Sequence, residues 1–377
     1  MMKQLRLYLL NLIGTKRNYL ALGVALVILA ALAYNFVATN EGYYHKTIAK
    51  IIALTGQTAP DSEGNFTQQV DAVIMNGAHR GEQIKLHNYT SLAQANDEQL
   101  KVNDEVFVNL RFTTANQIKS ATITNFKRDK YIVYIALVFS LLILFIGGLK
   151  GLRSMVSVVI NGVIILLVID LYLHGLNLIL VASGASVLFI VLSILIVSGR
   201  NKKTLAAIVG TMAGTLLAMS ITAGVIFMTK GKGIHYEEME FLTTSPTAIF
   251  MAEILIGTLG AIMDIAISIS AAVQEMYDNN PDIPTLALLN SGREIGQDIM
   301  GTMANTLVFA YLSGSIPMIL LWLKNGFSIF YIIGVNINLE IIRALVGSIG
   351  IVISIPVTLL IAVLLLKQNK LEEAEDL

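Results

Sequence analysis

The sequence predicts an all-α polytopic membrane protein of about eight transmembrane helices, with an internal parallel helix-pair repeat and a small extracytoplasmic β-barrel-like domain between the first and second helices. Hydrophobic residues make up 55% of the 377 residues and charged residues 14%, whereas a soluble domain carries about 25% charged residues. The mean hydropathy is +0.70. A polar stretch, residues 40–129, separates the first apolar run from the others. Together these observations argue against a soluble globular protein.

Eight apolar runs reach the roughly 20 residues that cross a hydrocarbon core about 30 Å thick. They cover residues 19–37, 131–149, 155–173, 176–197, 205–228, 246–272, 300–323 and 344–366. Lys and Arg cluster beside the first, second, fourth and eighth runs. Since positive charge in short flanks marks the cytoplasmic side, eight spans with both termini cytoplasmic place all four clusters together. Residues 1–39 then form the cytoplasmic N-terminus and anchor, and 367–377 the cytoplasmic tail.

The first run is also compatible with a cleaved signal peptide, because Ala31 and Ala33 form an Ala-x-Ala site. The apolar stretch is long for that role, so an uncleaved anchor is preferred. In both interpretations residues 40–129 lie outside the cell.

Residues 40–129 are rich in Gly, Asn, Asp, Gln and Thr and show no helical apolar stripe. Five short segments with partial alternation, separated by turn residues, predict strands over 46–54, 68–75, 82–88, 105–112 and 117–125. Five short strands favour an OB-like or SH3-like barrel. No aromatic and basic stripe marks a nucleic-acid surface, and the formal net charge is zero. We therefore expect a structural or partner-docking module and no nucleic-acid partner.

Two pairs of segments indicate an internal repeat inside the membrane domain, residues 130–366. Residues 210–216 match 301–307 in six of seven positions at an offset of 91, and 257–265 resemble 347–355 at an offset of 90. The repeats cover about 203–275 and 294–366, and a pseudo-twofold axis along the membrane normal should relate them. Small residues let helices approach closely in lipid. Those expected at helix contacts are Gly210, Gly214, Gly257, Gly260, Gly301, Gly347 and Gly350.

Ionisable residues lie inside several apolar runs, where a carboxylate costs roughly 2.5 to 3.5 kcal/mol at the helix centre. Glu253 and Asp264 are 11 residues apart and share a helix stripe. Glu340 and Arg343 are one turn apart, and the repeat places Arg343 opposite Glu253. A Glu253–Arg343 contact is therefore predicted. The alternatives are interfacial ion pairs, or protonated acids that only hold helices together.

A second polar face precedes and enters the seventh run. Its members follow an i, i+4, i+7, i+11 pattern, which places them on one side of a helix: Glu294, Asp298, Gly301 and Asn305. The alternative interpretation is a helix end at the cytoplasmic surface.

Nothing in the sequence indicates an enzyme. It has no Cys, and it lacks the HExxH, GxSxG and Walker A patterns. The five His residues lie outside the apolar runs. We therefore expect no catalytic residue, metal site or cofactor.

The segments 253–264, 292–305 and 340–343 resemble those of the YibE/F family of bacterial membrane proteins. The overall plan of an anchor, a short exported domain and a multi-span body is also similar. The resemblance implies a protein of the bacterial plasma membrane, of the longer YibE-like type. It also implies a shorter YibF-like membrane partner, with a homo-oligomer as the alternative.

Two functions are weighed. The first is a secondary transporter or permease for an ion or small solute, in which Glu253 and Asp264 bind or exchange the cation, Asn305 coordinates it and Arg343 controls a carboxylate. The second is a scaffold that does not transport and presents the β domain to a partner.

Overall fold

The computed structural model describes residues 16–62, 64–91, 97–113, 117–239 and 245–375. The chain divides into two compact units, Met1–Leu152 and Arg153–Leu377. The first unit contains α2 (Lys16–Thr39), the short 3₁₀ helix η1 (Asn40–Tyr43), five strands and the first part of α3 (Asp129–Leu173). The strands are β1 (Thr47–Gln57), β2 (Phe66–Ile74), β3 (Gln83–Thr90), β4 (Glu105–Phe112) and β5 (Ile118–Phe126). Each overlaps a strand predicted from the sequence.

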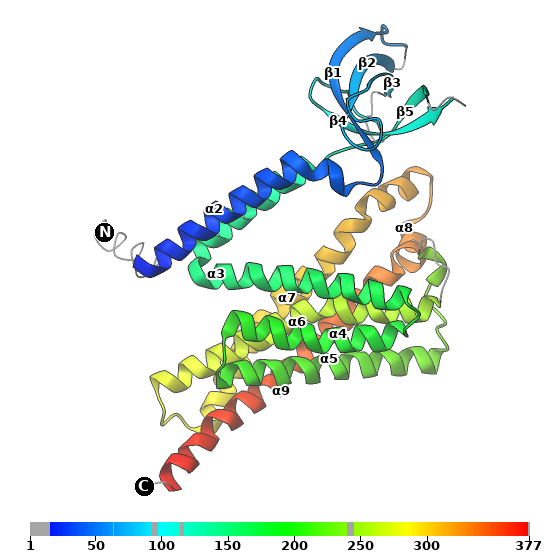
Figure 1. Cartoon of the computed structure of the whole chain (residues 1–377). Helices are drawn as coiled ribbons and strands as arrows, with labels where there is room; N and C mark the ends of the chain where they lie inside the picture. The colour runs from blue at the N-terminus through cyan, green and yellow to red at the C-terminus, as the bar shows by residue number, and fades with distance from the viewer. Residues whose placement is uncertain (1–15, 63, 92–96, 114–116, 240–244, 376–377) are drawn as a thin grey trace. The chain divides into compact units, whose positions relative to one another are not determined.

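The five strands form one antiparallel sheet in the order β3-β2-β1-β4-β5. Register shifts interrupt the β1–β2 and β4–β5 pairings, and such bulges increase local twist. The edge strands β3 and β5 come into contact, as the curled sheet in Figure 1 shows. Alternate side chains point inward, so Ile51, Val70, Leu86 and Val106 form a fully buried core. The antiparallel sheet is confirmed, whereas the choice between an OB-like and an SH3-like barrel stays a prediction.

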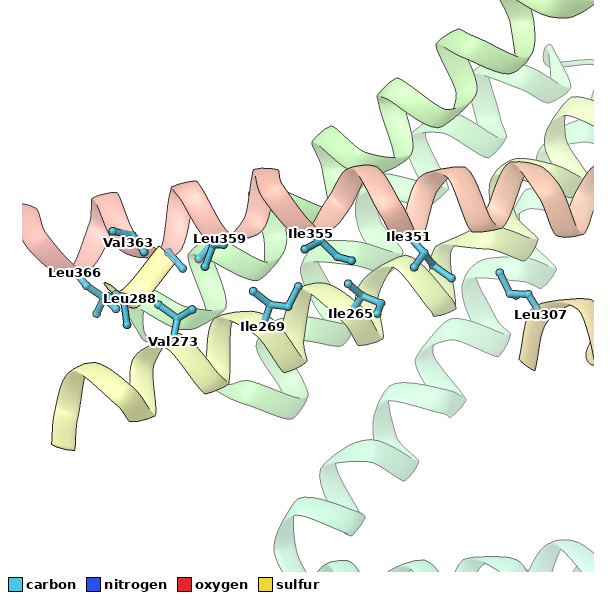
Figure 2. Close-up of a cluster of buried hydrophobic side chains, with 12 residues drawn as sticks. Ile265, Ile269, Val273, Leu288, Leu307, Ile351, Ile355, Leu359, Val363 and Leu366 are labelled. Atoms are coloured by element: carbon cyan, nitrogen blue, oxygen red, sulfur yellow. The ribbon is translucent and has the colours of Figure 1, made fainter. Parts of the chain in front are cut away.

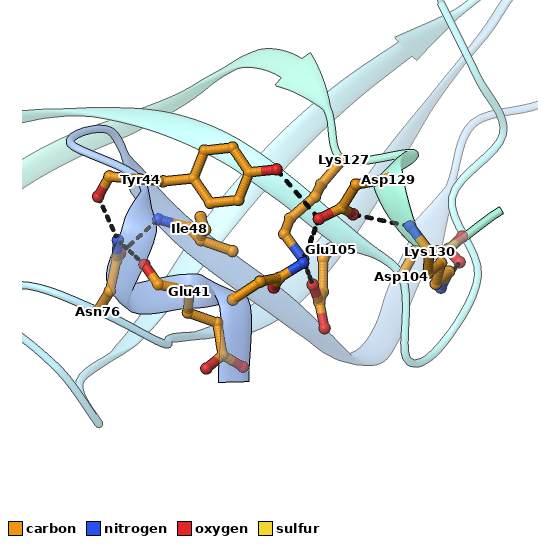
Figure 3. A network of polar contacts seen from close by, with 10 residues as sticks. Glu41, Tyr44, Ile48, Asn76, Asp104, Glu105, Lys127, Asp129 and Lys130 are labelled. Atoms are coloured by element: carbon orange, nitrogen blue, oxygen red, sulfur yellow. Dashed lines mark hydrogen bonds and ion pairs between the residues drawn. The ribbon is translucent and has the colours of Figure 1, made fainter. Parts of the chain in front are cut away.

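A buried ionic network joins the sheet to the start of α3 (Figure 3). The Lys127 ammonium lies 2.5 Å from Glu105 Oε2 on β4 and 3.3 Å from Asp129 Oδ2 at the first residue of α3. Tyr44 and Asn40 also donate hydrogen bonds to Asp129. Because Asn40 follows α2, both helical connections of the β domain converge on one carboxylate.

The Asn76 side chain fixes the entry into the sheet (Figure 3). Its Oδ1 accepts from the backbone N–H of Ile48 at 2.8 Å, and its Nδ2 donates to the carbonyls of Glu41, Tyr44 and Lys46 at 3.0 to 3.2 Å. One amide therefore satisfies four backbone groups between η1 and β1.

A kink divides α3. Gly148 has φ 55° and ψ −132° inside the 45-residue helix, a conformation that residues with a Cβ rarely adopt. Just beyond it, a Cβ on Gly151 would lie 2.4 Å from the carbonyl oxygen of Ile143. The kink falls at the end of the predicted span 131–149 and before the predicted span 155–173.

The second unit contains the rest of α3 and five further long helices. These are α4 (Leu178–Ser198), α5 (Lys202–Thr229), α6 (Pro246–Asn279), α7 (Thr285–Lys324) and α9 (Asn338–Glu375). Short helical turns connect them: η2 (Tyr236–Glu238), α8 (Ile329–Tyr331) and the π-helix η3 (Ile332–Asn336). Helix α7 begins 15 residues before the predicted span 300–323, because residues 285–299 continue the helix as a polar segment.

Six helices in the described part of the chain are long and apolar enough to cross a membrane. They are α3, α4, α5, α6, α7 and α9. The first predicted span, 19–37, lies within α2, which is not among the six, and two predicted spans share α3. A mostly helical membrane protein is therefore established, and the count of eight spans stays a prediction.

The main core of the second unit lies between α6 and α9, as Figure 2 shows. Ile265, Ile269 and Val273 of α6 face Ile351 and other aliphatic residues of α9. Helix α9 also packs against α5 and α7. The two predicted helix pairs, α5 with α6 and α7 with α9, are thus adjacent, and their central contact is apolar over most of its length.

Candidate functional site

Glycines let α5 and α9 approach each other closely where the two helices pack. A Cβ on Gly210 would lie 2.0 Å from Thr358 Oγ1 and 3.0 Å from its Cα, and one on Gly214 would lie 2.8 Å from Ser354 Cβ. On α9, a Cβ on Gly347 would meet Leu307 at 2.7 Å, and one on Gly350 would meet Ile262 at 2.5 Å. No side chain larger than hydrogen fits at these positions without a shift.

The other three glycines expected at helix contacts differ from one another in what surrounds them. A Cβ on Gly257 would lie 2.5 Å from the Tyr311 hydroxyl of α7. A Cβ on Gly260 or Gly301 meets no heavy atom within 4 Å among the described residues. Among the described residues, therefore, no close contact supports the packing role expected of Gly260 and Gly301. Although Gly210 and Gly301 are equivalent in the predicted repeat, their surroundings are not.

This difference gives a testable prediction. Gly210→Ala should lower the free energy of unfolding by about 1 to 3 kcal/mol, because the new methyl group meets backbone as well as side chain. Gly301→Ala should be neutral or slightly stabilising, since alanine favours a helix by about 1 kcal/mol over glycine. Thermal unfolding of both purified variants in detergent checks this. Equal losses in the two variants would contradict it.

An ionic cluster lies where α6 and α9 begin. The Arg343 Nη2 atom lies 2.5 Å from Glu253 Oε2, and its Nη1 atom donates a hydrogen bond to Glu340. The guanidinium also lies 5.6 Å from the centre of the Phe250 ring. The predicted Glu253–Arg343 contact is confirmed. A planar guanidinium suits this role because its separate N–H groups can serve two carboxylates at once.

Local structure explains how the cluster forms. Glu340 and Arg343 are one turn apart in the first turns of α9, so they share a face, and Glu253 lies in the second turn of α6, which starts at Pro246. The π-helix η3 ends at Asn336, just before α9. Such turns are rare and occur frequently at functional sites.

A polar pocket of about 240 Å³ surrounds the cluster. It is lined by Glu238, Met239, Glu253, Asn336, Leu339, Glu340 and Arg343. Asn336 Nδ2 donates a hydrogen bond of 3.2 Å to Glu238 Oε2. Three carboxylates face one guanidinium, so the pocket carries an excess of negative charge when its acids are ionised. This composition favours a cation over an anion.

Sequence reasoning missed Glu238 and Asn336. Both lie in the connections between apolar runs, and the search for costly charges covered only the runs and the helical turns that lead directly into them. The available signal was the pair of acids Glu237 and Glu238 and the two amides Asn336 and Asn338, each placed just before a long apolar helix.

Several buried polar atoms around the pocket have no hydrogen-bond partner in the described part of the chain: Arg343 Nε, Asn336 Oδ1, Asn338 Oδ1 and Tyr236 Oη. A buried polar atom without a partner costs about 1 to 3 kcal/mol. This region therefore has unused capacity both to donate and to accept hydrogen bonds. Water or a polar solute would satisfy it.

The remaining candidate residues do not join this cluster. Asp264 of α6 and Glu294, Asp298 and Asn305 of α7 are exposed. None of their side chains forms a hydrogen bond or ion pair with another described residue. The structure thus brings together Glu253, Glu340 and Arg343 and leaves the other four on the surface of the second unit.

The six long apolar helices define the chain as a helical membrane protein with a small antiparallel β domain. The chain belongs to the YibE/F family. Residues 135–368 match the YibE/F-like protein family, and residues 42–126 match the YibE/F family N-terminal domain. Searches of curated proteins and of solved structures found no match.

Proposed function

We propose that this chain is a secondary transporter or permease of the bacterial plasma membrane that moves a cation or a small cationic solute. The observation that carries the proposal is the Glu253–Arg343–Glu340 cluster in a pocket with excess negative charge. Ionisable residues inside membrane helices are costly and typically mark ion or proton pathways. With both termini cytoplasmic, as the charge distribution predicts, this pocket opens on the extracytoplasmic side.

The cluster supports a simple exchange mechanism. Arg343 binds one carboxylate of its own helix, Glu340, and one of α6, Glu253. The Glu253 side chain is 42% exposed and the Arg343 side chain 15%, so an incoming cation or proton reaches Glu253 first. Neutralising Glu253 weakens its bond to Arg343, and Glu340 keeps the guanidinium paired. The link between α6 and α9 then depends on occupancy of the site.

Asp264 is the second element of the proposal. It lies three turns further along α6 than Glu253, is exposed on the second unit and has no side-chain partner among the described residues. A charged carboxylate facing lipid at that depth is unfavourable. We place Asp264 and Asn305 beside a water-filled part of the path, with Asp298 and Glu294 towards the cytoplasmic end.

The test is ion flux into proteoliposomes that contain the purified chain. A pH-sensitive dye inside the vesicles reports proton movement under imposed sodium and potassium gradients. Glu253→Gln is expected to lower the flux at least about tenfold, the effect of losing about 1.4 kcal/mol of ion binding. Asp264→Asn should also lower it.

Glu237→Gln is the matched control. Glu237 precedes the pocket residue Glu238, but its side chain is 66% exposed and pairs with His235. This variant should keep full flux. Full flux in both Glu253→Gln and Asp264→Asn would remove these residues from the mechanism.

A second candidate function is favoured by the network in Figure 3. Lys127 and Asp129 meet in this network, and Asn40 donates a hydrogen bond to Asp129. Together they tie the β domain to both of its helical connections, an arrangement that suits a module held in place for a partner. In that case the chain is a scaffold, and the partner is a shorter YibF-like membrane protein or a second copy. No catalytic activity or cofactor is proposed. Deleting residues 42–127 distinguishes the two functions, because a transporter body should still conduct without the β domain.

A further inference from the structure

Another polar pocket, of about 420 Å³, lies where α5 begins and α6 ends. We refer to it as the α5–α6 end pocket. Its volume falls within the range of roughly 300 to 1,000 Å³ that is usual for small-molecule sites. It shares no residue with the pocket around Arg343, so it is separate from the proposed ion pathway. It is lined by Asn201, Lys202, Lys203, Gln274 and Asp278.

The pocket lies at the level where two membrane helices leave the hydrocarbon. Lys202 is the first residue of α5, and Asp278 is the last but one of α6. The apolar run of α5 begins at residue 205 and that of α6 ends at residue 272, so the pocket is within about two helical turns of both. Phospholipid headgroups occupy this interfacial layer. With both termini cytoplasmic, as the charge distribution predicts, the layer belongs to the cytoplasmic leaflet.

The start of α5 supplies positive charge to the pocket. The Lys203 side chain forms no hydrogen bond or ion pair with another described residue. The Lys202 ammonium donates to the carbonyl of Leu365 on α9 at 3.0 Å, and its other N–H groups have no partner in the described part of the chain. The backbone N–H groups of the first helical turn add to the attraction for an anion. Two ammonium groups at a helix N-terminus therefore suit a phosphate.

The end of α6 supplies negative charge and hydrogen-bond acceptors. Gln274 Nε2 donates a hydrogen bond of 2.7 Å to Asp278 Oδ1. Asp278 Oδ2 and Gln274 Oε1 accept from no other described residue, so both can accept from a ligand. A primary ammonium has three N–H donors and can serve both oxygens. A quaternary ammonium has no N–H donor, so it would gain only the charge of Asp278.

An apolar surface runs from the pocket into the membrane. Leu205 and Val209 follow Lys202 by three and seven residues, so all three share one face of α5. The Leu205 and Val209 side chains are 49% and 39% exposed. A ligand with its polar end in the pocket can therefore lay a hydrocarbon chain along α5. A soluble phosphate compound would leave this surface unused, so the combination favours a lipid.

From these observations we propose that the α5–α6 end pocket binds the phosphoethanolamine headgroup of a phospholipid. Lys202 and Lys203 bind the phosphate, and Asp278 with Gln274 binds the ammonium. Basic pockets between membrane helices on the cytoplasmic side are known sites for lipid headgroups. The acid opposite the two lysines distinguishes this pocket, because it favours a headgroup that carries both charges over a purely anionic one.

The test is native mass spectrometry of the full chain, purified in detergent and titrated with one lipid at a time. Phosphatidylethanolamine, phosphatidylcholine and phosphatidylglycerol with identical acyl chains are compared. The first phosphatidylethanolamine should bind with a Kd about tenfold lower than that of phosphatidylcholine, equivalent to about 1.4 kcal/mol. It should also bind more tightly than phosphatidylglycerol, which has no ammonium for Asp278. Binding of either of these two lipids as tight as that of phosphatidylethanolamine would overturn the proposal.

Two variants locate the binding in the pocket. Asp278→Asn should remove the preference for phosphatidylethanolamine over phosphatidylcholine and strengthen the binding of phosphatidylglycerol. Lys203→Gln should weaken the binding of all three lipids about three- to tenfold, because all three carry the phosphate. The matched controls are Glu275→Gln and Arg200→Gln, since both residues are exposed and neither lines the pocket. Both controls should bind the three lipids as the unaltered chain does.

Two further outcomes would contradict the proposal. One is an Asp278→Asn variant that keeps the lipid preference of Glu275→Gln, which would place the lipid elsewhere on the chain. The other is displacement of phosphatidylethanolamine by an equal concentration of soluble phosphoethanolamine, which would identify the ligand as a soluble compound. We expect no such displacement, because the soluble compound lacks the contact with Leu205 and Val209.

Discussion

Replacing Arg343 with methionine is expected to lower the free energy of unfolding by about 3 kcal/mol, because removing one partner of a buried ion pair leaves charge uncompensated. Two carboxylates, Glu253 and Glu340, lose their counter-ion at once. We expect a loss of stability at the lower end of the range that is usual for a buried ion pair, because the Glu253 side chain is 42% exposed. Unfolding of the purified chain in mixed micelles, with increasing denaturing detergent, measures the loss.

The control for this prediction is Arg293→Met. Arg293 of α7 is exposed and forms no ion pair with any described residue, so its loss should change stability by no more than about 0.5 kcal/mol. Adding Glu253→Gln and Glu340→Gln to Arg343→Met should restore most of the stability, because neutral side chains need no counter-ion. A single variant as stable as the unaltered chain would contradict the prediction. So would a triple variant no better than the single one.

Replacing Lys127 with methionine is expected to cost about 3 to 5 kcal/mol in the β domain, since Glu105 and Asp129 would be left without their shared cation. The Lys127 side chain is 3% exposed and the two carboxylates 16%. Hydrogen exchange should show faster exchange in β1 and β4. Lys130→Met is the control, because Lys130 lies 3.7 Å from Asp104 in a more exposed pair and should cost at most about 1 kcal/mol.

The same network predicts the response to pH. Burial alone would lower the pKa of the Lys127 ammonium, but the hydrogen bonds and charges of Glu105 and Asp129 outweigh it and raise that pKa above 10.5. Burial, and then Asp129, raise the pKa of Tyr44 above 10.0. Both groups hold their protons more tightly in the folded state. Their contribution to stability is therefore complete below about pH 10 and is lost as pH rises through the raised values.

An alkaline titration of the hydrogen exchange in β1 and β4 checks this response. Protection should fall above about pH 10, and the fall should be smaller in Lys127→Met. Protection that is unchanged at alkaline pH would contradict the assignment of this network as the joint of the β domain.

Several features were predictable from the sequence because they depend on local pattern. Apolar runs indicate membrane helices whatever surrounds them, and alternation in residues 40–129 indicated all five strands. The contact between Glu253 and Arg343 was predictable for a different reason. At an offset of 90 residues, the sequences of two helices align as copies of one repeat. Residues at equivalent positions of the two copies are expected to face each other in space.

Other features depend on packing that sequence periodicity does not contain. Lys150 and Arg153 separate two apolar runs in the sequence, but the single helix that joins these runs through a kink at Gly148 is seen only in the structure. Glu238 and Asn336 enter the pocket because the structure brings η2 and η3 together, where Asn336 donates a hydrogen bond to Glu238. Asp264 shares a stripe with Glu253, and both side chains are exposed, but only Glu253 lies within reach of Arg343 on α9.

The sequence by itself determined a helical membrane body, a five-stranded polar domain, membership of one family and one long-range ion pair. These features follow from residue type and spacing. Both are informative in a membrane protein, because placing polar groups in lipid is costly. Only the tertiary structure decided which candidate residues share a pocket, which glycines touch another helix and where a pocket opens at the ends of α5 and α6. Those outcomes depend on the angles and offsets at which helices meet, and side chains far apart in the chain set them jointly.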